Sequence, residues 1–124
     1  MTQPLDGPAP KARIGKENSP RLVMLTVQQI IKDFGMFGYP IRYTGKPEDA
    51  YEQLFEELYK VVEEINKESF DKLLDILGKI GISTQLVKET LEAKASNTVA
   101  NTISSLVMEQ EFMKVYLREG SQPQ

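Results

Sequence analysis

The fold class of this chain is decided by residues 47–65, PEDAYEQLFEELYKVVEEI. Apolar residues recur there every three or four positions, which is the period of one face of an α-helix. Pro47 and the acidic pair that follows it suit the first turn of a helix, where the free N–H groups favour negative charge. The apolar stripe of this predicted helix consists of Tyr51, Leu54, Phe55, Leu58, Val62 and Ile65.

Four further segments show the same helical period, and mostly short connections separate them. These helices are expected at about 20–34, 67–79, 84–94 and 97–118. Glycines that stop helices and side chains that cap them give the expected ends. The stops are Gly35 and Gly81, and the N-caps are Ser19, Asn66, Ser83 and either Ser96 or Asn97. The pattern predicts an all-α protein, a compact bundle of about five helices whose neighbours are mostly antiparallel.

The composition divides the chain into three parts. Residues 1–19 are rich in proline and glycine and hold few large apolar side chains, so they predict an extended or disordered N-terminal arm. Residues 20–119 form the predicted helical bundle domain, and residues 120–124 a frayed tail.

Histidine, cysteine and tryptophan are absent from the 124 residues. Their absence excludes disulfide bonds, thiolate and imidazole metal sites, and catalysis by histidine-based triads or cysteine nucleophiles. We therefore expect a protein without enzymatic activity, cofactor or bound metal. The chain begins without the features of a signal peptide, and its longest apolar run, Leu22 to Leu25, is much shorter than a membrane span. These features favour a cytoplasmic protein with no membrane segment.

Two aromatic and apolar regions suggest contacts with a partner. The first is the irregular segment 34–43, in which rings accompany glycine and proline; such residues also suit a loop that caps the bundle. The second is the predicted helix 97–118, whose apolar arc is so wide that it is either central in the bundle or in contact with a second chain. The candidate partner-binding residues are Phe37, Tyr39, Ile41, Tyr43, Met108, Phe112 and Tyr116.

The charge of the chain is concentrated on the predicted helix at 47–65. Whereas the whole chain has a net charge of −3, residues 47–68 hold eight carboxylates against two lysines, a net −6. Carboxylates opposite an apolar stripe are typical of a solvated helix face, and such a face also attracts a basic partner. The acidic face consists of Glu52, Glu56, Glu57, Glu63 and Glu64.

Two glycine-containing segments resemble phosphate-binding elements in part. Residues 78–83 resemble the helix-hairpin-helix elements that bind DNA, although two residues rather than one separate Gly78 from Gly81. Residues 44–46, Thr-Gly-Lys, precede a predicted helix as in a phosphate loop, but proline follows the lysine where a hydroxyl residue is required. The mild acidity of the chain disfavours nucleic acid as a partner.

These observations favour a non-enzymatic protein–protein interaction module, such as a small subunit or accessory factor of a larger assembly. Its expected partners are proteins, and homo-oligomerisation is left open. An acidic inhibitor or immunity-type protein that masks a basic site on its partner is the alternative. Nucleic-acid binding through the 78–83 hairpin is the weaker alternative.

Overall fold

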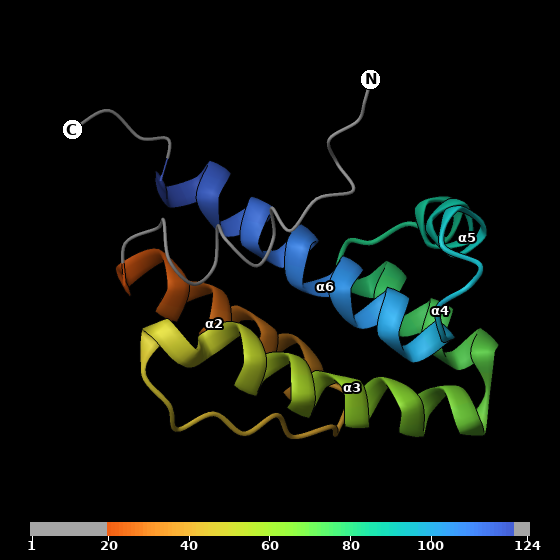
Figure 1. Cartoon of the computed structure of the whole chain (residues 1–124), viewed down its shortest axis with the longest axis horizontal. Helices are drawn as coiled ribbons and strands as arrows, with labels where there is room; N and C mark the ends of the chain where they lie inside the picture. Colours follow the sequence, from red (N-terminus) through yellow and green to blue (C-terminus); the bar gives the residue numbers. More distant parts are fainter. Residues whose placement is uncertain (1–19, 121–124) are drawn as a thin grey trace.

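A computed structural model describes residues 20–120, and five α-helices account for most of them (Figure 1). No strand occurs within the described residues, so the predicted all-α class and the five helices are confirmed. The arm expected at 1–19, with its Ser19 cap, and residues 121–124 lie outside the described residues. The elements are α2 (Pro20–Gly35), the 3-10 turn η2 (Pro47–Asp49), α3 (Ala50–Glu68), α4 (Phe70–Lys79), α5 (Thr84–Ala93), α6 (Val99–Val115) and the π-helical turn η3 (Tyr116–Gly120).

Helix α6 is the central helix of the bundle. It lies across α2 and α3 and also contacts α5 (Figure 1). The wide apolar arc of this helix is covered, because Val107 and Met108 are each fully buried and Phe112 is 2% exposed. Of the two interpretations of its wide apolar arc, the central position is therefore the one observed. Leu117 lies beyond the end of α6, in η3, and is exposed.

The connection between the first two helices sets the direction of α3. Residues 36–46 run back along the outside of the bundle, so α2 and α3 point the same way and α6 runs antiparallel to both (Figure 1). The expectation of mostly antiparallel neighbours is therefore wrong for α2 and α3. Helices joined by a short turn must reverse direction, whereas an eleven-residue segment is long enough to return the chain to its starting end.

The left-handed residue that follows α2 lies three positions beyond the predicted stop at Gly35, which is itself the last residue of the helix. The left-handed residue is Gly38, with φ of 88°, and not Gly35. Its N–H donates to the carbonyl of Gly35, and the N–H of Tyr39 donates to that of Phe34, each at 3.0 Å. These two bonds form the Schellman motif that closes a helix, and the buried pair of Phe34 and Tyr39 supplies its usual apolar contact.

Two predicted N-caps are wrong and one is confirmed. Helix α3 continues through Asn66, and the side chain of Ser69 caps α4 instead. Thr98 caps α6 by accepting from the N–H of Asn101 at 3.1 Å, one or two residues after the expected position. Ser83 caps α5 as predicted, with 3.1 Å to the N–H of Leu86. Each observed cap places a hydroxyl oxygen on an N–H group that has no partner within its own helix.

The core of the bundle gives a direct test of the orientation of α3. Leu58 is fully buried at the centre of this helix. Leu58→Ala is expected to lower the free energy of unfolding by about 2–5 kcal/mol, because the variant loses apolar burial and leaves a cavity. Urea unfolding followed by circular dichroism measures this loss. The change Glu64→Ala at an exposed position of the same helix serves as a control. A loss below about 1 kcal/mol for Leu58→Ala would contradict this packing.

A helix that crosses a bilayer must be both long and apolar. No helix within residues 20–120 combines the length and the apolarity that this requires.

Candidate partner-binding site

Three aromatic side chains form a row along α3, one helical turn apart. Tyr51 and Phe55 stack with ring centroids 5.8 Å apart and an interplanar angle of 8°. The ring of Phe55 is 6.1 Å from that of Tyr59, at an angle of 49°. All three rings are half-buried and pack against the core. Their spacing of four residues brings them onto one face of the helix, so they form a continuous aromatic surface.

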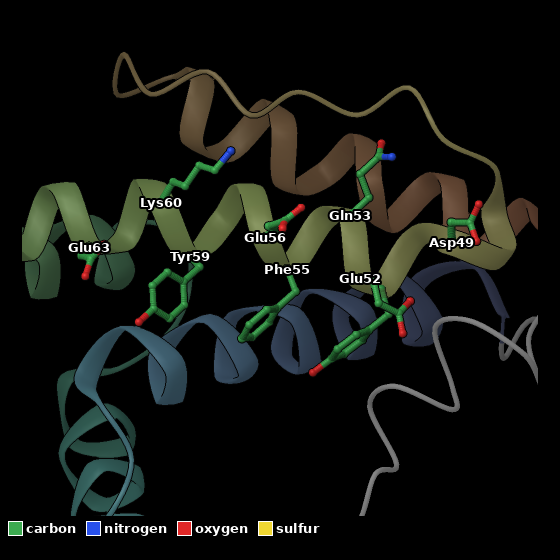
Figure 2. Close-up of a pocket in the computed structure, with 9 residues that line it drawn as sticks. Asp49, Glu52, Gln53, Phe55, Glu56, Tyr59, Lys60 and Glu63 are labelled. Carbon is green, nitrogen blue, oxygen red and sulfur yellow. The ribbon is translucent and has the colours of Figure 1, made fainter.

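This aromatic row lies in a groove of about 920 Å³ on the surface of α3. Figure 2 shows Phe55 and Tyr59 on the side of α3 that faces α6, and Gln53 and Lys60 on the opposite side. Glu56 lies between these two sets of side chains, in front of the helix in this view. The groove is lined by Asp49, Tyr51, Glu52, Gln53, Phe55, Glu56, Tyr59, Lys60 and Glu63.

The groove carries a strong negative charge. Four carboxylates line it against one ammonium, that of Lys60. This ammonium is 3.2 Å from a carboxylate oxygen of Glu57, so its charge is already compensated from outside the groove. The predicted acidic face therefore divides in two: Glu52, Glu56 and Glu63 line the groove, whereas Glu57 and Glu64 do not.

Sequence reasoning found this site only in part. Tyr51 and Phe55 were predicted to be in the buried stripe of α3, but each remains partly exposed, and Val61 is buried instead. Tyr59 was missed, although its position four residues after Phe55 was a usable signal.

The aromatic loop packs onto the bundle. Tyr39 and Ile41 are buried, and Phe37 and Tyr43 are half-buried. The ammonium of Lys72 lies 5.4 Å from the centroid of the Tyr39 ring, within the range of a cation–π contact. A partner that approached this surface would meet Phe37 and Tyr43 before the other two. Their role as contacts stays a prediction.

The candidate partner-binding residues on and after α6 also differ from one another in burial. Met108 and Phe112 are buried core residues of α6, so the bundle itself covers this part of the wide apolar arc. Tyr116 is 37% exposed, and its ring lies 6.2 Å from that of Phe112. None of the seven candidate residues from the loop and the last helix lines the groove on α3.

The two glycine-containing segments use their N–H groups within the chain. At the 78–83 hairpin, the N–H of Gly81 donates to Gly78 at 3.1 Å and that of Ile82 to Leu77 at 2.8 Å. Gly81, with φ of 104°, is thus the predicted helix stop. The N–H groups of residues 44 and 45 both donate to the side-chain oxygen of Gln53 at 2.9 Å. Neither segment therefore presents these groups to a phosphate.

A cluster of two buried carboxyl groups and the partly exposed Lys114 was missed from the sequence. Glu111 is 1% exposed on α6, and Asp33 is 7% exposed on α2. The ammonium of Lys114 lies 3.0 Å from Glu111 Oε1 and 3.6 Å from Asp33 Oδ2, and it donates to the carbonyl of Ile80 at 3.1 Å. The cluster thus joins α2, α6 and the end of α4. A signal was present, since Glu111 follows Val107 and Met108 by one helical turn.

The position of Glu111 changes its acidity. The pKa of Glu111 is raised from 4.5 to about 8, first by burial and second by the nearby Asp33 carboxyl, against a smaller lowering by the Lys114 ammonium. At neutral pH this carboxyl is therefore mostly protonated. A neutral carboxyl costs much less to bury than a charged one, which is consistent with its place in the core.

Comparisons of the chain with protein-family models, with curated proteins and with solved structures found no match. Within residues 20–120, no three carboxylates or other ligating side chains come together in a group that could hold a metal ion.

Proposed function

We propose that this protein is a non-enzymatic protein-interaction module, and that the groove on α3 binds a basic segment of its partner. The observation that carries the proposal is the aromatic row of Tyr51, Phe55 and Tyr59 beside four carboxylates in one groove. Partly exposed aromatic side chains supply binding free energy when a partner covers them. The carboxylates favour a partner of opposite charge and speed its approach.

The charge of the groove also argues for a partner other than a second copy of the chain. Two copies that met through this face would bring their carboxylates together, and like charges in contact oppose association. The same charge repels nucleic acid. The hairpin at 78–83 adds nothing in favour of nucleic acid, because its N–H groups bond within the chain.

A pair of double variants tests this function. The probe is a fluorescent amphipathic helical peptide that carries both lysine and arginine on its polar face. Glu56→Lys with Glu63→Lys is expected to weaken binding of this peptide at least tenfold, because the change reverses two charges inside the groove. Fluorescence anisotropy at about 0.15 M salt measures the affinity.

The matched control is Glu89→Lys with Glu92→Lys, which makes the same change of charge on α5. These exposed residues lie on a different helix, and neither of them lines the groove. The control is therefore expected to change the affinity by less than about threefold. Equal losses in the two double variants, or an affinity that does not depend on salt, would contradict the proposal.

A further inference from the structure

We infer that the groove on α3 selects arginine over lysine, in a partner segment that presents its arginines along one face of a helix. This inference rests on the proposed function and specifies the chemistry of the partner.

The first argument is the pairing of rings with carboxylates along α3. Tyr59 is followed one helical turn later by Glu63, so the two side chains are neighbours on the surface of α3. Glu56 lines the same groove, and Figure 2 shows it between the rings and Lys60. A planar guanidinium stacks on an aromatic face and also forms two hydrogen bonds with a carboxylate. An ammonium is a strongly hydrated point charge, so it gains less from such a pair.

The second argument is the periodicity of the aromatic row. Successive rings are 5.8 and 6.1 Å apart, and all three lie along the single helix α3. On the surface of a partner helix, residues three or four apart have Cβ atoms about 5–6 Å from one another. Residues on the same face of a β-strand are about 6.6–6.8 Å apart. The repeat therefore matches the side chains of a helix that lies along α3 more closely than those of a strand.

The third argument concerns what an uncharged occupant would leave unpaired. A purely apolar helix would cover the rings, but it would also remove water from Glu56 and Glu63 without supplying a donor. Carboxylates that lose water without gaining a hydrogen-bond partner oppose binding. Arginine satisfies both kinds of group at once, because it offers a flat face to the ring and N–H donors to the carboxylate.

Three peptides of equal length and charge test the inference on the full chain. The first is an amphipathic helical peptide with an arginine at every fourth residue, so that the arginines share one face of the helix. The second has lysine in place of each arginine. The third has the composition of the first, but its arginines are distributed around the helix. The first peptide is expected to bind about tenfold more tightly than each of the others. Affinities within twofold for the arginine and lysine peptides would overturn the inference.

A substitution in the aromatic row links this preference to the groove. Tyr59→Leu keeps an apolar side chain but removes the ring, so it is expected to weaken the arginine peptide about threefold or more and the lysine peptide less. Tyr116→Leu, outside the groove, is the matched control. Circular dichroism verifies folding, and Phe55→Leu replaces Tyr59→Leu if that variant unfolds. An unchanged preference in the folded variant would also overturn the inference.

The outcomes separate the inference from the function on which it rests. If the arginine and lysine peptides bind equally and the double variant in the groove still loses affinity, the partner is basic but the site does not distinguish the two cations. If the double variant in the groove behaves like its matched control, the proposed function itself is wrong.

Discussion

Phe112→Ala is expected to lower the free energy of unfolding by about 3–5 kcal/mol. The ring is 2% exposed at the centre of the bundle, on a helix that packs against α2, α3 and α5. Its removal takes apolar surface out of the core and leaves a cavity that neighbouring helices fill only in part. The variant is expected to have the same self-association as the unchanged protein, because a ring in the core does not contact a second chain.

Urea unfolding and sedimentation of the same samples measure the two effects separately. Tyr116→Ala is the control, since Tyr116 is the partly exposed ring that stacks on Phe112. Its truncation is expected to cost about 1 kcal/mol or less. A small loss of stability with a changed oligomeric state for Phe112→Ala would instead place the residue at an interface, as the sequence first suggested.

Raising the pH from about 5 to 8 is expected to destabilise the protein through Glu111. The pKa of this group is about 8 in the folded protein and 4.5 in its ordinary state. Because the folded pKa is the higher one, the stabilisation is fully present below about pH 4.5 and is lost as the pH rises through 8. At about 1.4 kcal/mol per unit of pKa, the whole difference corresponds to at most about 5 kcal/mol.

The composition leaves few groups that titrate in the pH range of this experiment. The chain has no histidine, so Glu111 and the amino terminus are the expected sources of proton binding between about pH 6 and 8. Glu111→Gln keeps the shape of the side chain and cannot titrate. Its melting temperature is expected to lack the decline of the unchanged protein over this range, and at pH 8 it is expected to exceed that of the unchanged protein.

Glu109→Gln, a change of the same kind at a less buried position on the same helix, is the control. It is expected to follow the pH profile of the unchanged protein. Parallel profiles for the unchanged protein and Glu111→Gln would show that Glu111 does not retain its proton in the folded state.

The amino-acid sequence by itself determined the helices of this protein and several of their ends. The period of the apolar stripe in residues 47–65 predicted a helix there, and Gly81 and Ser83 marked the end of α4 and the start of α5. Such features depend on hydrogen bonds between residues a few positions apart, so a short stretch of sequence contains the information they require. The acidic face of α3 was predictable for the same reason, because its carboxylates repeat with the helical period.

Only the tertiary structure decided which apolar and charged side chains are covered. The sequence left open whether Met108 and Phe112 face the core, and the packing of α2, α3 and α5 around α6 buries both. The same packing brings Asp33 close to Lys114 and Glu111, and leaves the rings of α3 partly exposed in an acidic groove. Burial depends on contacts between segments far apart in the chain, and the helical period of a single segment does not specify which neighbours cover each of its faces.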